Sequence, residues 1–285
     1  MRRLCWLLLL FLVTAPLAAH ADGFALAKQG FQAQKQGQWD EAIRLYSAAL
    51  EAGDLDDKSR LLVMGLRGNA LGIRGRYDEA VQAFDAAIRR DPSSPLPYVG
   101  RGMVHLQMGA ADLAIADDEA AMKIAPEDRF AQANRALARF YLGRFDAAAE
   151  DYASLHAHDP ADAGFLLWLH IARERAGADD DDAFRQDAAA IDPARWPGPA
   201  VAYFLGQGTA EEVMAAADQG SKAERLQQGC EAGFYLGEAA LLKGDRSTAQ
   251  AEFRKVLTDC DLYRGNYVYF SRAYGAAAAE LKRLP

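Results

Sequence analysis

The sequence lacks the short motifs that mark common enzyme active sites. Its 285 residues include only 3 cysteines and 5 histidines. It contains no His-Glu-x-x-His metalloprotease motif, no Gly-x-Ser-x-Gly nucleophile elbow, no Gly-x-Gly-x-x-Gly dinucleotide loop and no phosphate loop ending in Gly-Lys-Ser/Thr. These absences argue against the corresponding hydrolases, oxidoreductases and nucleotidases. We therefore expect no catalytic residue and no cofactor, and a protein that is not an enzyme.

Metal ligands at a usual spacing are also missing. The one loose histidine pair, His156 and His158, stands just before Asp159-Pro160. We expect both rings on the surface near a helix C-terminus, where positive charge is favourable. The acidic run from Asp179 to Asp182 lacks the alternate spacing and the glycine of a calcium loop, so we expect a solvated turn there. The sequence therefore predicts no metal site.

The N-terminus holds the one long apolar run. Two arginines precede an apolar stretch from Leu4 to Val13 and the small-residue site Ala19-His20-Ala21. This order is typical of a secretory signal, so residues 1–21 are expected to be removed by cleavage between Ala21 and Asp22. Cys5 lies at the start of the apolar run, far from the cleavage point, so no lipid anchor is expected there. We expect a soluble periplasmic chain with no stable membrane insertion.

Acidic side chains outnumber basic ones. There are 40 aspartates and glutamates against 32 lysines and arginines, which gives a formal net charge of −8. A surface of this sign repels the phosphates of nucleic acids and of anionic lipids. Proteins or peptides are therefore favoured as partners, and nucleic acid is not expected.

What the sequence does contain is a pattern that returns every 34 residues, with an earlier copy running from Gly37 to Ala49. This is the period of the tetratricopeptide repeat, in which each copy is a helical hairpin that buries its apolar face against the next. We predict an all-α solenoid, a right-handed superhelix of antiparallel hairpins. The recurring positions carry a turn glycine, small and aromatic residues and a closing proline: Gly75, Tyr77, Ala80, Phe84, Ala87 and Pro92, then Gly109, Ala111, Ala114, Ala121 and Pro126, then Gly143, Phe145, Ala148, Tyr152 and Pro160.

The pattern divides the mature chain into three parts. Four repeats occupy residues 22–162. Residues 163–220 form a truncated repeat and an irregular helical segment with a corner at Trp196-Pro197-Gly198-Pro199. Residues 221–285 hold a complete hairpin over 230–263 and a lone closing helix over 266–284, which is suited to capping the open end of the stack.

The first helix of each hairpin is expected to line a concave groove that binds the partner. Asn69 and Asn134 can hold an extended peptide by its main chain, or can instead bond to neighbouring helices. A competing docking site is the irregular segment from Arg195 to Gly220. The predicted groove residues are Phe31, Asn69, Arg101, Met103, Phe130, Asn134, Phe140 and Tyr141.

Three arginines share the seventh position of their repeats. Arg67, Arg101 and Arg135 lie one repeat apart, so they can present a row of guanidinium groups to acids on a partner. The alternative is pairing within the chain with second-helix acids such as Asp85 and Glu119, and we favour this alternative.

Two cysteines remain after removal of the signal. Cys230 and Cys260 occupy positions 1 and 31 of the last hairpin, and these positions lie at the same end of two antiparallel helices. Disulfides persist in the compartment that the signal indicates. We predict a Cys230–Cys260 disulfide, and two free buried thiols are the alternative.

The second half of the chain carries a resemblance to a known family. The segment Trp196-Pro197-Gly198-Pro199-Ala200-Val201-Ala202-Tyr203-Phe204-Leu205-Gly206 is followed by Cys230-Glu231-Ala232-Gly233-Phe234-Tyr235-Leu236-Gly237, leading into Gly244-Asp245. With the signal and four repeats before them, this order resembles the bacterial NlpI lipoprotein family over essentially the whole mature chain. Two features depart from that family: the lipobox is absent, and the cysteine pair is additional.

The resemblance implies a role as an adaptor of the cell envelope, with a possible homodimer. Members of that family bring a tail-specific protease to murein hydrolases and help to organise peptidoglycan enzymes. The preferred function is therefore a non-catalytic periplasmic adaptor that binds proteins in its groove. The alternative is a factor that touches peptidoglycan directly, with Phe130 and Tyr141 as stacking surfaces.

Overall fold

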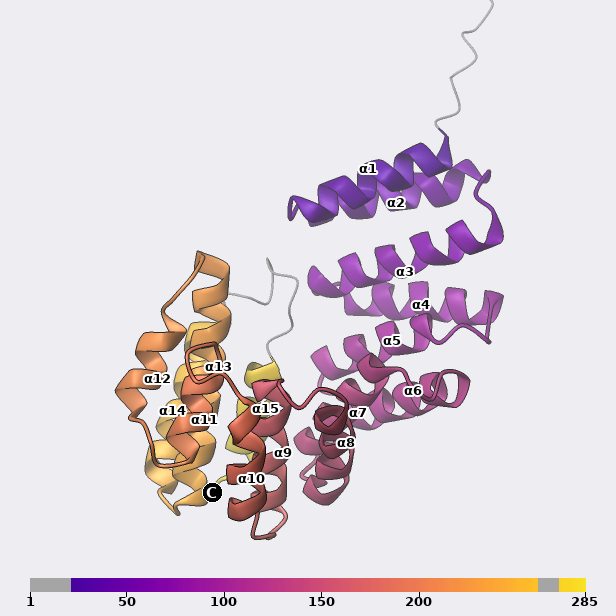
Figure 1. Cartoon of the computed structure of the whole chain (residues 1–285). Helices are drawn as coiled ribbons and strands as arrows, with labels where there is room; N and C mark the ends of the chain where they lie inside the picture. Colours follow the sequence, from indigo (N-terminus) through magenta and orange to yellow (C-terminus); the bar gives the residue numbers. More distant parts are fainter. Residues whose placement is uncertain (1–21, 261–271) are drawn as a thin grey trace, which may run out of the picture.

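The computed structural model describes residues 22–260 and 272–285, and within these ranges the chain is helical throughout, without a strand (Figure 1). The predicted signal peptide, with Ala21 on one side of its cleavage site, lies outside the described residues. None of the described helices is both long and apolar enough to cross a membrane. The all-α prediction is confirmed.

The first half of the structure is a stack of four helical hairpins. Each hairpin packs against the next, as the 34-residue period predicts. The eight helices are α1 (Gly23–Lys35), α2 (Trp39–Ala52), α3 (Asp57–Ile73), α4 (Tyr77–Arg90), α5 (Leu96–Gln107), α6 (Ala111–Ile124), α7 (Arg129–Tyr141) and α8 (Phe145–His158).

Local sequence signals fix where these helices begin and end. An aspartate side chain accepts a hydrogen bond from a first-turn amide at the start of three first helices, at Asp22, Asp56 and Asp128. Each turn between the two helices of a hairpin contains a glycine with positive φ, a conformation that other residues rarely adopt. These glycines are Gly37, Gly75, Gly109 and Gly143.

Small residues let the two helices of a hairpin approach each other. A β-carbon added to Gly68 would lie 2.8 Å from the ring of Phe84, and one added to Gly30 would lie 2.8 Å from the ring of Tyr46. Both distances are shorter than a van der Waals contact. The pairing of a glycine at the eighth position with an aromatic ring at the twenty-fourth therefore sets the spacing of the hairpin.

The second half of the chain turns back beside the fourth repeat, and α15 lies next to α9 in Figure 1. Its last long hairpin begins eight residues earlier than the predicted start at residue 230, because Ser221 and Glu224 form a capping box at the start of α13. The helices are α9 (Ala163–Arg175), α10 (Asp181–Asp187), a short 3₁₀ turn (Ala188–Ala190), α11 (Gly198–Phe204), α12 (Ala210–Ala217), α13 (Lys222–Leu242), α14 (Arg246–Cys260) and α15 (Arg272–Arg283).

The closing helix α15 does more than cap the open end of the stack. It packs against α14 and α13, and it also contacts α7 of the fourth repeat. The Arg283 guanidinium donates to the carbonyl oxygens of Phe140 and Tyr141 at 2.8 and 2.5 Å. One continuous hydrophobic core runs from Leu106 to Ala277, whereas the first repeats have small separate cores.

Two expectations about polar side chains hold only in part, because His158, Asp179, Asp181 and Asp182 are exposed as expected but His156 and Asp180 are not. His156 is buried and lies 3.5 Å from Asp187, so it is not a surface residue. Asp180 is not in a solvated turn, because it is buried and receives hydrogen bonds from His170 and Arg173 at 3.0 and 2.7 Å. The partner of His156 comes from another helix, α10, whereas the partners of Asp180 lie only 10 and 7 residues earlier in the chain, on α9.

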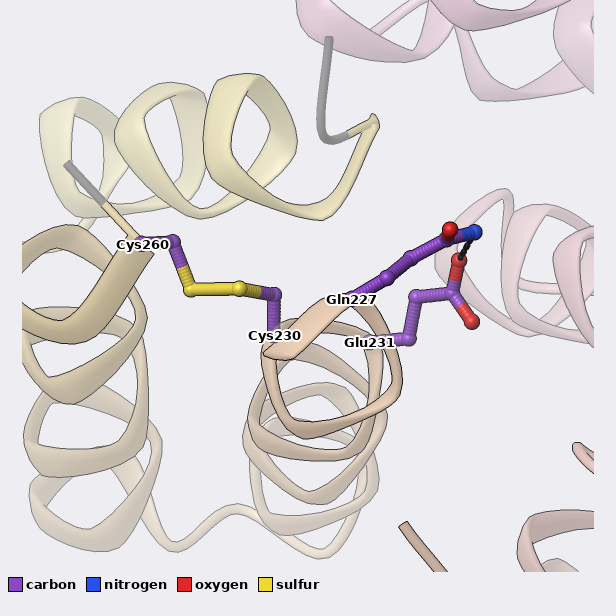
Figure 2. Close-up of a disulfide and its surroundings, with 4 residues drawn as sticks. All are labelled: Gln227, Cys230, Glu231 and Cys260. Atoms are coloured by element: carbon purple, nitrogen blue, oxygen red, sulfur yellow. Dashed lines mark hydrogen bonds between the residues drawn. A yellow bond between two sulfur atoms is a disulfide. The ribbon is translucent and has the colours of Figure 1, made fainter. Parts of the chain in front are cut away.

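A disulfide joins Cys230 of α13 to Cys260 at the end of α14, as the hairpin register predicts (Figure 2). The two α-carbons are 6.0 Å apart. Both cysteines are buried, and Gln227 and Glu231 of the same helix are joined by a hydrogen bond of 3.1 Å beside them.

Replacing both cysteines by serine is expected to lower the free energy of unfolding by about 3–4 kcal/mol. The sequence separation of the bridge is 30 residues, and closing a loop of this size removes entropy from the unfolded chain. Urea unfolding of the double variant and of the oxidised parent measures the difference. Alkylation of both cysteines in unreduced, denatured parent protein would contradict the bridge.

Candidate functional site

Large apolar side chains are exposed at the second position of all four first helices. Most exposed apolar residues on a protein surface are scattered singly and carry no meaning. Here an apolar residue is exposed at the same position of every repeat, so these residues form a regular pattern on the surface. They are Phe24, Leu62, Leu96 and Phe130, with exposed fractions of 65%, 58%, 68% and 78%.

The ninth position continues this surface two helical turns further along. Phe31 and Met103 are exposed there, and Asn69 is exposed at the same position of the second repeat. Residues seven apart lie on the same face of a helix, and successive first helices contact each other. We call the seven residues Phe24, Phe31, Leu62, Asn69, Leu96, Met103 and Phe130 the first-helix stripe.

The stripe is long enough for an extended peptide. Neighbouring helices pack about 8–10 Å apart, so three steps from α1 to α7 span roughly 25–30 Å. An extended chain rises about 3.3 Å per residue, and about eight residues cover that distance. Three of the predicted site residues, Phe31, Met103 and Phe130, lie in the stripe as apolar anchors, and Asn69 adds an amide among them.

The prediction that Phe140 and Tyr141 line an open groove is wrong. Phe140 is fully buried, with its ring against those of Phe145 and Trp168. The Tyr141 hydroxyl donates to the carbonyl oxygen of Arg272 at 2.9 Å, and burial raises the pKa of Tyr141 well above its ordinary value. Helix α15 therefore covers this end of α7.

Arg101 is also occupied within the chain. Its guanidinium donates to Asp117 of α6 at 3.0 and 2.5 Å and pairs with Asp85 of α4. The hydrogen bonds to Asp117, ahead of those to Asp85, raise the pKa of Arg101. The internal alternative is thus confirmed for Arg101, which is not available to a partner as a free cation.

Asn134 differs from Asn69 in its surroundings. Asn69 is exposed in the stripe, whereas Asn134 is partly buried and its side chain lies beside the carboxyl group of Asp118. Of the two amides, Asn69 is the one placed to meet a peptide backbone.

Three residues of the first-helix stripe, Phe24, Leu62 and Leu96, were not in the predicted site. The repeat register places the second position of each first helix on the inward face. Applied to every repeat, that signal finds all three residues.

A second opening lies beside the irregular segment. A cavity of about 560 Å³ is bordered by Trp168 of α9, Arg195 and Trp196 of the corner, and Tyr235 of α13. The Trp196 indole donates to the Glu231 carboxylate at 2.7 Å, which fixes the corner on α13. The competing docking segment from Arg195 to Gly220 therefore begins at a real depression.

The first-helix stripe holds no cluster of titratable side chains. Across residues 22–260 and 272–285, no three His, Cys, Asp or Glu side chains converge as metal ligands. The first-helix stripe offers apolar area and one amide, which can bind a polypeptide but supplies no nucleophile or general base. Its chemistry is that of recognition.

Comparison with known proteins agrees with the fold. A tetratricopeptide repeat family model matches residues 29–95 and 65–129. A tetratricopeptide repeat protein from Parabacteroides merdae is similar in structure, with a TM-score of 0.55, 14% identity, and coverage of 90% of this chain and 98% of that chain. The pilF protein of Pseudomonas aeruginosa is similar with a TM-score of 0.51 and 15% identity, over 90% of this chain and 97% of that chain. MamA is similar with a TM-score of 0.50 and 19% identity, over 58% of this chain and 88% of that chain.

These findings define the class of the protein. It is a helical repeat protein with exposed apolar side chains along its first helices. The repeat is the tetratricopeptide repeat, and the fold is a tetratricopeptide repeat solenoid. Proteins of this class mediate protein–protein interaction and are typically non-catalytic scaffolds.

Proposed function

We propose that this protein is a non-catalytic adaptor that binds partner proteins or peptides along the first-helix stripe. The observation that carries the proposal is the exposed apolar residue at the second position of all four repeats, Phe24, Leu62, Leu96 and Phe130. At protein interfaces a few buried anchor residues, often aromatic, supply most of the binding energy.

The cellular setting of the proposal comes from the sequence. The signal-like residues 1–21 and the resemblance of the second half to the NlpI family support an adaptor that is exported to the periplasm. We propose that its partners belong to the same group, a tail-specific protease together with murein hydrolases or peptidoglycan synthesis enzymes. A homodimer of the chain belongs to this proposal as well.

Replacing Leu96 and Phe130 by alanine is expected to weaken partner binding by about 30-fold or more, since loss of anchors at an interface costs about 2 kcal/mol or more. The matched control is Leu113→Ala with Ile124→Ala, because these apolar residues are also exposed but lie on the second helix α6. The control should bind as the parent does. Capture from a periplasmic extract identifies the partner, and titration of the purified partner measures the affinity.

Two outcomes would contradict partner binding along the first-helix stripe. Unchanged capture by the folded Leu96→Ala, Phe130→Ala protein, together with loss of capture when Trp196 is replaced, would place the partner on the irregular segment. Sedimentation of the parent with purified peptidoglycan, lost in the Phe130 variant, would favour the glycan-binding alternative, in which the exposed phenylalanine rings stack on sugars.

A further inference from the structure

The seventh-position arginines of the third and fourth repeats are each satisfied by carboxylates. Arg101 contacts Asp117 through two nitrogens and also reaches Asp85 of the preceding hairpin. Arg135 contacts Asp151 through two nitrogens at 3.1 and 2.6 Å. In both repeats the acid stands 16 residues after the arginine, which is the twenty-third position of the repeat. The paired groups form an arginine ladder between first and second helices.

The second repeat breaks this ladder. Sixteen residues after Arg67 the chain has Ala83, and the residue that corresponds to Asp85 in the preceding repeat is Ser47. The Arg67 Nε atom is buried and has no hydrogen-bond partner. Among the described residues no carboxylate pairs with Arg67. The arginines at the same position of the next two repeats, Arg101 and Arg135, each bind a carboxylate through two nitrogens.

Arg67 lies in a cleft rather than in a packed core. An opening of about 660 Å³ is lined by residues of α2, α3 and α4, among them Arg67 and Ala83. The cleft is separate from the first-helix stripe, because second-helix residues form most of its wall. The full lining is Leu50, Arg60, Met64, Arg67, Glu79, Gln82, Ala83, Asp85, Ala86, Arg89 and Arg90.

The charges around the cleft favour a single negative group. Four arginines line it against two acids, and both acids are already engaged: Glu79 by Arg76, and Asp85 by Arg101. Of the other arginines, Arg60 donates to two main-chain carbonyls and Arg90 pairs with Asp57. The cleft is thus a basic site on a chain whose net charge is −8.

We propose that the cleft binds a carboxylate from an acidic segment of a partner protein, which completes the arginine ladder at Arg67. A carboxylate matches the planar fork of a guanidinium in two parallel hydrogen bonds. Asp117 and Asp151 show that arginines at this register accept such a group. A carboxylate is favoured over a phosphate because the anions that meet the seventh-position arginines of the next two repeats, Asp117 and Asp151, are both carboxylates.

The proposal is tested by introducing an acid of this chain at the position where the ladder lacks one. Ala83→Asp places an acid at the ladder position, where it is expected to pair with Arg67 as Asp117 pairs with Arg101. The probe is a hexaglutamate peptide, with hexaglutamine as the uncharged peptide. Binding is followed by the Nε–Hε resonance of Arg67, assigned from the Arg67→Lys protein. In the parent, hexaglutamate should shift this resonance and hexaglutamine should not.

Ala83→Asp should lower the hexaglutamate affinity about ten-fold or more, because the internal acid competes with the peptide. Ala83→Asn adds similar volume without the charge and should lower the affinity much less. Equal losses in the two variants, an equal shift with hexaglutamine, or tighter binding of inorganic phosphate than of hexaglutamate would each overturn the proposal. Since the probe has no apolar side chain, its result is independent of the first-helix stripe and of the adaptor function proposed for it.

Discussion

Replacing Arg175 by alanine is expected to lower the free energy of unfolding by about 3–5 kcal/mol, because the change removes the ion-pair partner of the buried Glu238 and leaves the buried Glu280 with Arg283 alone. Arg175 of α9 lies 2.8 Å from Glu238 of α13 and 2.8 Å from Glu280 of α15. Both glutamate side chains are fully buried. The guanidinium also lies over the ring of Phe145, 4.5 Å from its centre.

Denaturant unfolding followed by circular dichroism measures this effect. The matched control is Arg44→Ala, since Arg44 pairs with Glu41 on the open surface of α2 and such pairs add little. Adding Glu238→Gln to the Arg175→Ala protein should restore part of the loss, because Glu238 is the buried acid that loses its ion-pair partner, whereas Glu280 also pairs with Arg283. A loss no larger than that of the Arg44 control would show that the buried cluster does not hold α9, α13 and α15 together.

The stability of the protein is expected to fall between about pH 4 and pH 9 because of Asp118. This residue stands at the twenty-fourth position, where the other repeats carry Tyr46, Phe84 and Tyr152, and its side chain is fully buried. Neither carboxyl oxygen has a hydrogen-bond partner within the described ranges. Burial, and next the charge of Asp117, raises the pKa of Asp118 from 3.8 to about 9.

The raised pKa fixes the direction of the effect. Below about pH 4 the carboxyl group is protonated in both the folded and the unfolded chain. Between about pH 4 and pH 9 the folded chain keeps a proton that the unfolded chain has lost, so the free energy of unfolding decreases by up to about 1.4 kcal/mol per pH unit. The stabilising contribution is therefore complete at low pH and is lost as the pH rises through the folded pKa.

Asp118→Asn removes this titration and serves as the comparison. Unfolding of the parent and the variant in urea at pH 5, 6, 7 and 8 gives two pH profiles, and the difference between them should grow in favour of the variant as the pH rises. Taking the difference cancels other groups, including Glu238, whose pKa burial raises to about 8. Parallel profiles would mean that Asp118 does not carry a proton in the folded chain.

The repeat register predicted the first eight helices well because each hairpin is specified locally. The glycines between the two helices, the capping aspartates and the eighth-position glycines all act within about 30 residues of their partners. The start of α13 was misplaced although its signal was present, since Ser221 and Glu224 have the spacing of a capping box. The same register also contained Leu62, which the predicted site left out.

Other errors could not have been avoided by local analysis. Phe140 and Tyr141 occupy inward positions of α7, and what hides Tyr141 is a helix 131 residues further along the chain. His156 is likewise buried beside Asp187, which belongs to α10 and not to the repeat of His156. Periodicity describes how neighbours stack, but it does not describe contacts between distant repeats.

Because α15 contacts α7, we expect the two halves of the chain to differ in how cooperatively they unfold. In a plain repeat array each unit touches only its neighbours, so the ends can open one unit at a time. Helices α7 to α15 are joined across the chain and share one core, and we expect them to open together. Helices α1 to α4, with their small separate cores, remain compliant. Four of the seven residues of the first-helix stripe lie on α1 and α3, so we expect much of this surface to adjust its curvature when a partner binds. Helices α7 to α15 are expected to keep their arrangement.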